Sequence, residues 1–273
     1  MDLELDDDQS TLRDAARSLL AAECPPSLVR AVHEDDDGDR AQGDRLWSTL
    51  CAHDWPAVGV PEEQGGLGLG FVEVGVLVEA LGRAVAPGPF LATATQFAPA
   101  LRAAGREDCL RAVAAGTCTG SLAIAEAGRW SADSVVARAS RDPAGGWQLS
   151  GLKEHVLVGA TVDELVVAAR DDVGLGVFLV PGDAVHAEGV RTIDPTLALA
   201  SVRLDGASVG EERVLVEPGD PRAPEVLRHA LDVATAALAL STVATCRVIL
   251  ESTISYAQER EQFGRPIGSF QAL

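Results

Sequence analysis

The spacing of apolar residues changes twice along this chain, and these changes limit the folds that it can adopt. Up to Gly116 apolar residues recur every three or four positions, which is typical of helices. From Gly116 to about Pro218 the period is two, in short Val-rich segments bounded by Gly, Pro or Asp, which indicates strands. Beyond Pro224 the helical period returns. The sequence therefore predicts a multidomain α+β chain with an N-terminal all-α domain over residues 1–117, a middle β-barrel or sandwich over 118–217 and the start of a C-terminal helical bundle over 218–273.

Individual elements follow from the same patterns. Helices are expected over residues 3–22, 45–53, 72–85, 92–104, 106–115 and 225–259, and strands over 121–126, 134–139, 164–170 and 176–181. The charge run over 33–40 predicts a solvated loop. The long helix at 225–259 is expected to bury one face of small and apolar residues, namely Leu227, Leu231, Ala234, Leu238, Ser241, Thr245 and Val248.

Composition limits the kinds of partner. The 273 residues are 47% hydrophobic but only 4% aromatic, so the core is expected to consist of Ala, Val and Leu. A formal charge of -19 disfavours binding to nucleic acid and to anionic membranes. A polyanionic ligand would therefore need a local cationic pocket.

The five cysteines are an odd number without Cys-x-x-Cys spacing, which predicts reduced structural thiols and no metal site. The acidic N-terminus lacks the basic and apolar regions of a signal peptide, and no uncharged apolar stretch reaches membrane-spanning length. These features predict a cytoplasmic protein that does not associate with membranes.

The last residues combine a helix with a tight turn that carries Arg260, Gln262, Phe263 and Gly264. A guanidinium, an amide and an aromatic ring at one helix end are suited to anion binding and ring stacking. Gly264 favours the left-handed backbone that ends a helix, and the following Pro266 prevents its continuation. On local chemistry alone, an ordinary corner between two helices explains the pattern equally well.

The run Tyr-x-x-x-Arg-x-x-Phe-Gly from Tyr256 to Gly264, followed by Phe270 and Gln271, resembles the signature of the acyl-CoA dehydrogenase family. Members of this family are FAD-dependent enzymes that desaturate acyl thioesters. The order helical, β, helical is also that of the family, so the resemblance covers essentially the whole chain. It implies FAD as cofactor, an acyl-CoA substrate and a dimeric or larger assembly, homomeric or with another acyl-CoA dehydrogenase-like subunit.

The segment from Gly59 to Gly70 is a weaker motif. Taken as a dinucleotide-binding loop it fails on spacing, because the third glycine position falls on Phe71. In the resemblance it corresponds to a loop beside the acyl pocket, where Glu62 and Glu63 have structural roles.

The resemblance also implies contacts with the flavin ring. The backbone N–H groups of Ala123 and Ala125 would face the ring, although Ala125 replaces the family's Thr. The family's Trp-Ile-Thr triplet corresponds to His155, Val156 and Leu157, so a second hydroxyl is absent. His155 could stack on the flavin or hydrogen-bond to it, but a strand residue with one satisfied nitrogen is the alternative.

The C-terminal turn is the best-preserved part of the resemblance. It implies that Arg260, Gln262, Phe263 and Gln271 reach the FAD of a partner subunit, with Arg260 on the pyrophosphate and Phe263 near the adenine. Asp232 resembles the family's Asp that contacts the CoA moiety.

No catalytic base can be assigned. The family needs a carboxylate opposite flavin N5, and the position of the long helix that supplies it in some members is Ala234 here. Two hypotheses follow: an FAD-dependent dehydrogenase whose base lies elsewhere, or a non-catalytic, partner-dependent subunit of a heteromeric enzyme. A β-barrel binding module unrelated to flavin is a third possibility.

Overall fold

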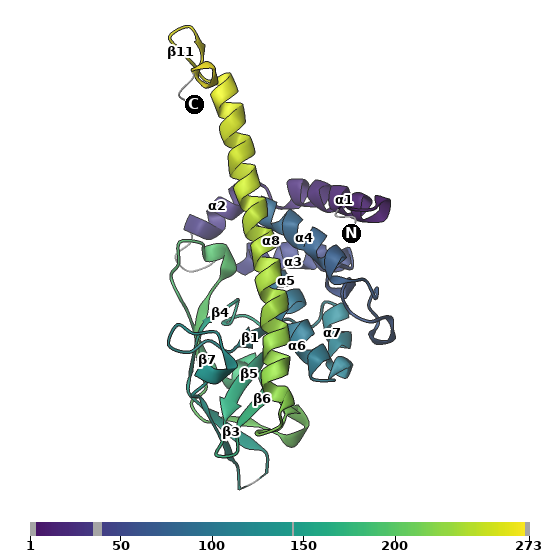
Figure 1. Ribbon diagram of the computed structural model, residues 1–273, viewed down its shortest axis with the longest axis vertical. Helices are drawn as coiled ribbons and strands as arrows, with labels where there is room; N and C mark the ends of the chain where they lie inside the picture. Colours follow the sequence, from purple (N-terminus) through teal and green to yellow (C-terminus); the bar gives the residue numbers. More distant parts are fainter. Residues whose placement is uncertain (1–3, 35–39, 144, 271–273) are drawn as a thin grey trace.

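The structure is a computed structural model that describes residues 4–34, 40–143 and 145–270. Helices form its first part, a β region follows, and one long helix runs along both and extends beyond them (Figure 1). The predicted fold class is therefore confirmed. The helices before the β region are α1 (Asp7–Glu23), α2 (Pro26–Glu34), α3 (Arg40–Ala52), α4 (Phe71–Ala84), α5 (Phe90–Ala92), α6 (Ala98–Ala103) and α7 (Leu110–Ala114).

Several helix boundaries differ from the sequence prediction; for example, α3 starts at residue 40 rather than 45 and α7 at residue 110 rather than 106. Helix α1 begins only at Asp7, because Asp6 caps it: the Gln9 N–H donates to Asp6 Oδ1 at 2.8 Å, and Gln9 Oε1 accepts from the Asp6 N–H. The predicted loop over 33–40 is wrong at its ends, since α2 includes Glu34 and α3 starts at Arg40. The rest of that loop lies outside the described residues.

The segment from Gly59 to Gly70 follows a short 3-10 helix (Trp55–Ala57), and a second one (Glu62–Gln64) lies within it. A dinucleotide-binding loop would follow a strand. The rejection of that motif is therefore confirmed.

The strands form two larger sheets. The first contains seven strands in the order β10-β6-β5-β2-β3-β9, with β1 also paired to β5. The second has the order β4-β8-β7. Their bounds are β1 (Gly120–Ala123), β2 (Arg138–Arg141), β3 (Trp147–Ser150), β4 (Leu152–Val156), β5 (Glu164–Arg170), β6 (Leu175–Pro181), β7 (His186–Gly189), β8 (Ala200–Arg203), β9 (Ala207–Val209) and β10 (Val214–Val216).

Strand β5 separates two hydrophobic cores. It pairs antiparallel with β6 from Glu164↔Pro181 to Arg170↔Leu175. On one face Val166 and Ala168 pack into the core shared with α6 and α8, while Leu165, Val167 and Ala169 point into the core within the β region. Alternate side chains of a strand point to opposite faces, so a strand buried on both faces is apolar throughout. Because one core spans helical and β residues, the domain boundaries at 117 and 217 remain a prediction.

Helix α8 (Arg222–Glu259) joins the two regions. Its buried residues are Ala223, Val226, Leu227, Ala230, Ala237 and Ala244. The predicted buried face is confirmed at Leu227, which is fully buried, and wrong at Leu238, which is 45% exposed while the neighbouring Ala237 packs inside. Helix α4 crosses α8 so closely that only small side chains fit between them, so Ala237 of α8 packs against α4.

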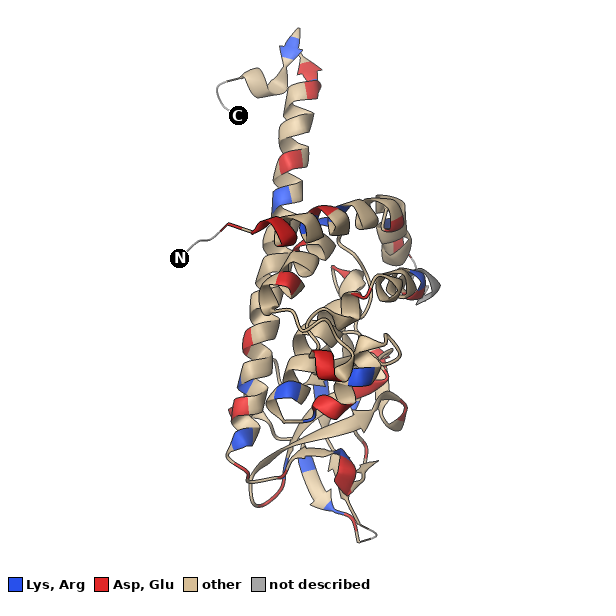
Figure 2. Ribbon diagram, turned by 90° about the vertical axis from the view of Figure 1, so that its right-hand side faces the viewer, with Lys and Arg blue, Asp and Glu red and all other residues tan. Residues whose placement is uncertain are grey.

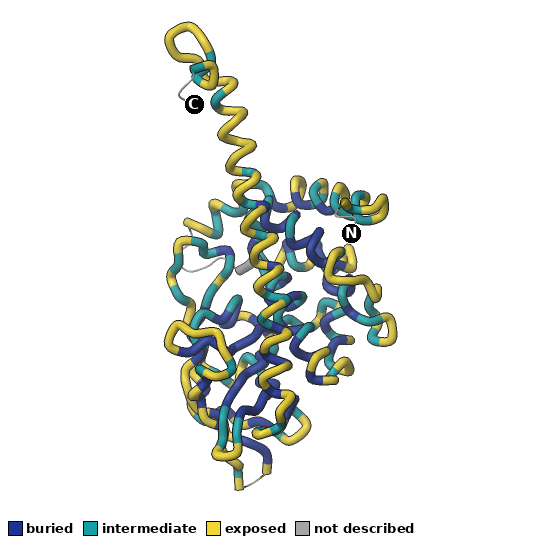
Figure 3. Tube along the Cα trace, viewed as in Figure 1, coloured by how far each residue is buried: buried dark blue, intermediate teal, exposed yellow. Residues whose placement is uncertain are grey.

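Beyond Ala244 no described residue of α8 is buried, and the helix projects from the body of the molecule (Figure 3). Glu251 still pairs with Arg83 of the body, so the eight residues from Ser252 to Glu259, at about 1.5 Å each, form about 12 Å of projecting helix. Large exposed apolar side chains lie both on this part of α8 and on the part beside the body; they are Leu238, Leu240, Val243, Ile249, Leu250, Ile254 and Tyr256. An uncovered apolar surface of this kind marks a site of association.

By length and composition, α8 also meets the criteria for a membrane-spanning helix, with a mean hydropathy of 1.8 over its most apolar window. Among described residues it is the one helix that does. This is weak evidence, because core helices of globular proteins meet the same criteria, and the first half of α8 packs on α4 and α6.

The chain then turns in a small hairpin, β11 (Glu261–Gln262) and β12 (Arg265–Pro266). Phe263 and Gly264 form its tip with φ of 53° and 77°. The left-handed backbone predicted at Gly264 is thus present, but it serves a hairpin turn, and α8 has already ended at Glu259.

Candidate functional site

The junction of β1 and β4 contains a buried ion pair. Lys153, the single lysine of the chain, is fully buried and its Nζ donates to a carboxylate oxygen of Glu126. The same carboxylate accepts from the backbone N–H groups of Val136 at 2.7 Å and of Ala137 at 3.1 Å. Burial lowers the pKa of Lys153, and Glu126 opposes that shift. The pair therefore links β4 to the residues just before β2, and Glu126 holds both ends of the segment between itself and Val136.

This turn brings an indole and an imidazole together. Ala127 and Gly128 have positive φ, so the chain reverses between Glu126 and Arg129 and directs Trp130 toward β4. The Trp130 ring lies 5.5 Å from the ring of His155, tilted by 36°. Trp130 remains 52% exposed.

His155 owes its position to an irregularity in β4. The register with β8 shifts between Lys153 and Val156, and His155 has a φ of 52°, as expected of a bulge that redirects a side chain. Its Nδ1 is buried and has no hydrogen-bond partner among the described residues. Such an atom costs about 1–3 kcal/mol unless a partner or ligand satisfies it.

The other predicted flavin-facing residues differ in surroundings. Ala123 and Ala125 are buried at the end of β1, and the Ala125 carbonyl accepts from the Glu154 N–H at 2.9 Å. Leu157, just after β4, instead lines a separate cavity.

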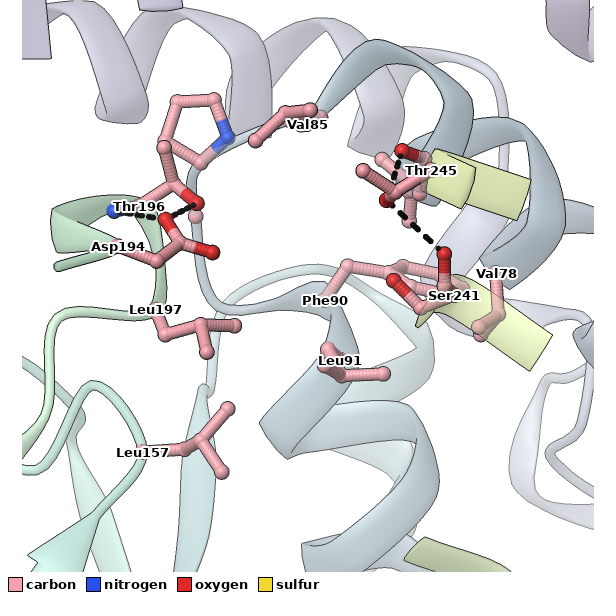
Figure 4. Close-up of a pocket in the computed structure, with 15 residues that line it drawn as sticks. Val78, Val85, Phe90, Leu91, Leu157, Asp194, Thr196, Leu197, Ser241 and Thr245 are labelled. Carbon is pink, nitrogen blue, oxygen red and sulfur yellow. Dashed lines mark hydrogen bonds between the residues drawn. The ribbon is translucent and has the colours of Figure 1, made fainter. Parts of the chain in front are cut away.

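This cavity lies between α4, the loop before α5, the segment 194–197 and α8, and has a volume of about 60 Å³ (Figure 4). Ligand sites for whole drug-sized molecules usually measure roughly 300–1,000 Å³. The chain as described therefore encloses room for the end of a ligand only. The lining residues are Val78, Leu81, Gly82, Val85, Ala86, Pro87, Gly88, Phe90, Leu91, Leu157, Asp194, Thr196, Leu197, Ser241 and Thr245.

Asp194 is the one ionisable side chain among the fifteen residues that line the cavity. Its Oδ1 accepts from the Thr196 N–H at 3.0 Å and from the Thr196 hydroxyl. Across the cavity, the Thr245 hydroxyl donates to the Gly82 carbonyl at 2.8 Å and so links α8 to α4. Figure 4 shows Asp194 on one side and Ser241 on the other, with Phe90 and Leu91 between them.

Acidic residues lie on many elements, with basic residues among them (Figure 2). The predicted CoA contact, Asp232, is exposed on α8 and forms an ion pair with Arg228 at 3.2 Å. Ala234 is half-buried on the same helix.

The C-terminal turn lies far from both the β1–β4 junction and the cavity, at the end of the projecting part of α8 (Figure 1). Arg260, Gln262 and Phe263 are all exposed, Phe263 by 95%. The Arg265 guanidinium lies 4.0 Å over the ring of Phe270. Gln271 lies outside the described residues.

The structure thus places the described residues among those predicted at four locations. Ala123, Ala125 and His155 lie at the β1–β4 junction, Leu157 lines the cavity, Asp232 is exposed on α8, and Arg260, Gln262 and Phe263 lie at the distal turn. Sequence reasoning missed Asp194, which no motif marks, and Trp130, whose partner His155 is distant in sequence. Their roles in ligand binding remain predictions.

Models of known protein families match both helical parts of the chain. Residues 6–121 match the family model for the N-terminal domain of acyl-CoA dehydrogenases, and residues 225–273 match the model for their C-terminal domain. The chain is 31% identical over 270 residues to acyl-CoA dehydrogenase IpdE2 of Mycobacterium tuberculosis, covering 98% of this chain and 69% of that protein.

Solved structures agree. The ChsE4-ChsE5 complex from Mycobacterium tuberculosis superposes with a TM-score of 0.85 at 26% identity, covering 100% of this chain and 72% of that one. The Tcur3481-Tcur3483 steroid acyl-CoA dehydrogenase variant superposes with a TM-score of 0.80 at 30% identity, covering 97% and 71%. The resemblance inferred from the turn at Tyr256–Gly264 is confirmed over the length of the chain, which is a member of the acyl-CoA dehydrogenase family of flavoprotein oxidoreductases.

Proposed function

We propose that this chain acts in the α,β-desaturation of an acyl-CoA thioester, as a subunit that depends on a second acyl-CoA dehydrogenase-like subunit. In this reaction a base removes a proton from Cα, and the hydride from Cβ passes to FAD, which supplies the redox chemistry. The products are an enoyl-CoA and the reduced cofactor. The chain contributes a part of the substrate pocket and a cationic turn.

The residues of this chain do not by themselves form a complete site for the flavin ring. At the β1–β4 junction Ala123 and Ala125 are buried and carry no side-chain hydrogen-bonding group. Leu157 is also apolar, so neither hydroxyl of the family pattern is replaced. His155 alone presents an unpartnered polar atom, Nδ1. No step of the reaction is therefore assigned to a ring bound at this junction.

No carboxylate that could abstract the proton is assignable among the described residues either. Ala234 cannot serve as a base, and Glu251, farther along α8, is held by the Arg83 guanidinium at 2.6 Å. We therefore expect the base to come from outside the described residues, either from a partner subunit or from further chain. The chain spans about 70% of the relatives that it matches, so both sources are open.

The observation that carries the proposal is the exposure of the C-terminal turn. Arg260 and Arg265 are exposed on a hairpin that contacts little of the rest of the molecule, in a chain with a net charge of -19. The two exposed guanidinium groups, which Glu259 and Glu261 flank, suit a polyanionic group held by another subunit, because the arginine fork matches phosphate oxygens. The exposed apolar face of α8 would lie in the same contact. The two solved relatives named above each pair two proteins, ChsE4 with ChsE5 and Tcur3481 with Tcur3483.

The second candidate is a dehydrogenase competent without a different partner, as a homo-oligomer completed by further C-terminal helices. The relatives' greater length favours it. In both cases we propose a cytoplasmic enzyme.

The test is the visible spectrum of the chain purified alone and co-purified with the product of the adjacent gene. We expect no flavin band, or one that acyl-CoA does not bleach, for the chain alone. For the complex we expect a band that bleaches without oxygen. Arg260→Ala should lower the flavin content of the complex, Arg260→Lys should lower it less, and Arg228→Ala should leave it unchanged. Full bleaching by the chain alone would refute partner dependence.

A further inference from the structure

We propose that Trp130 closes the flavin-ring position of this chain by packing on His155, so that no flavin ring binds at its own β1–β4 junction. The cofactor of the assembly would then lie only at the corresponding junction of the partner subunit. This inference rests on the proposed function, because it concerns the cofactor of the same reaction.

The first argument is the space between the rings of Trp130 and His155. Their centroids lie 5.5 Å apart, with a tilt of 36° between the two planes. A third aromatic ring inserted between them needs about 3.5–4.0 Å on each side, the optimal separation of carbon atoms in contact. The two centroids would therefore have to be about 7 Å apart or more. The indole itself thus takes the stacking position on the imidazole face that it covers.

The second argument is that protein atoms cover the groups that a flavin ring would contact. Ala123 and Ala125 are only 0% and 2% exposed in the chain by itself. The Nδ1 atom of His155 is buried as well. A backbone N–H or a ring nitrogen binds a ligand only where the ligand can reach it. A flavin ring would first have to displace the protein atoms that surround these groups.

The third argument is that the segment carrying Trp130 is held on both sides. Glu126 and Arg129 exchange two backbone hydrogen bonds, at 3.1 and 3.0 Å. After the indole, the Ala132 carbonyl accepts from the Arg170 guanidinium at 2.9 Å. A shift of the backbone would break these hydrogen bonds. To open the ring position, the indole would have to rotate into water and lose its contact with the imidazole.

The fourth argument is that the junction offers a flavin ring few polar contacts in exchange. Ala125 and Leu157 carry no hydrogen-bonding group on their side chains. The Ala125 carbonyl already accepts from the Glu154 N–H at 2.9 Å. The buried Lys153 ammonium is paired with the Glu126 carboxylate. A flavin ring would therefore replace one aromatic contact by another without gaining a hydrogen bond from these groups.

The first test is the ratio of FAD to protein in the purified chain and in its complex with the partner. FAD is released by denaturation and measured by its absorbance. We expect one FAD per pair of chains in the complex and none in the chain alone. One FAD per chain in the complex would overturn the inference, whereas the proposed function would stand if bleaching by acyl-CoA still required the partner. A complex without FAD would overturn both.

The second test is titration of the chain alone with riboflavin, which has the flavin ring but no phosphate, followed by flavin fluorescence. Trp130→Ala exposes the covered face of His155, whereas Trp130→Phe keeps an aromatic ring against it. Because stacking on an aromatic side chain is favourable, we expect Trp130→Ala to bind riboflavin about tenfold or more tightly than the wild type. We expect Trp130→Phe to resemble the wild type.

The control is Val173→Ala, which shortens an exposed side chain in the turn between β5 and β6 and should leave the affinity for riboflavin unchanged. Equal affinities of Trp130→Ala and the wild type would overturn the closing role of Trp130 while the proposed function stands. Far-ultraviolet circular dichroism confirms that each variant is folded. The FAD ratio of the unmodified complex tests the inference without any variant.

Discussion

Replacing Lys153 by Met is expected to be one of the most destabilising single changes in this chain. Glu126 would remain buried with a negative charge and no cation. Breaking a buried pair by removing one partner costs about 3–5 kcal/mol. The N–H groups of Val136 and Ala137 still donate to the carboxylate, so we place the loss near 3 kcal/mol, the lower end of that range. A domain is typically stable by only about 5–15 kcal/mol, so this is a large fraction.

Urea unfolding followed by tryptophan fluorescence measures the loss. In the double variant Glu126→Gln with Lys153→Met, the charge is gone and an amide oxygen can still accept from the backbone, so we expect recovery of about 1–3 kcal/mol relative to Lys153→Met. The control is Arg138→Met, which breaks an exposed pair with Asp172 at 4.0 Å and should cost at most about 1 kcal/mol. A loss below about 1 kcal/mol for Lys153→Met, or additive losses in the double variant, would refute the reasoning.

Three further predictions concern packing and thiols. Gly82→Ala would place a Cβ 2.4 Å from the Ser241 carbonyl oxygen. It should therefore separate α4 from α8 and lower the free energy of unfolding by about 1–3 kcal/mol or more, which a thermal melt measures. The control Gly43→Ala has free space around the new Cβ and should be neutral or stabilising in the same assay. Exposed Cys246 should be alkylated by iodoacetamide well before the half-buried Cys118, which peptide mass spectrometry can follow; equal rates would contradict the partial burial of Cys118. Burial raises the pKa of Cys118 from 9.0 to about 12, so the folded thiol keeps a proton that the unfolded one loses, and its contribution to stability should decline as the pH rises between these values.

Much of the fold was predictable because it depends on local patterns. Strand β5 matches the predicted segment 164–170 residue for residue, since a strand buried on both faces must be apolar throughout and bounded by polar residues. Helix α8 was expected within three residues of its observed start, and its end at Glu259 was predicted correctly. The buried face of α8 was predicted correctly at Leu227 but not at Leu238, because an Ala-rich helix has several similar faces and the close contact with Gly82 selects among them.

The candidate site was less predictable. The residues of the C-terminal turn were found because they form one contiguous motif, and the likeness to the family extends over the whole chain. Trp130 and His155 come from different segments, and their contact depends on a bulge that no local pattern marks. Asp194 was missed for the same reason, since its cavity exists only where four segments meet.

The sequence by itself therefore determined the order of helical and β regions, the long helix and the turn that identifies the family. These depend on the period of apolar residues and on Gly and Pro at turns, which act between neighbours along the chain. Tertiary structure alone decided that Lys153 neutralises Glu126, that Ala237 rather than Leu238 faces α4, and that Asp194 lies opposite Ser241. Such pairings depend on the close packing of distant segments, where burial and fit select one arrangement among many that local preferences allow.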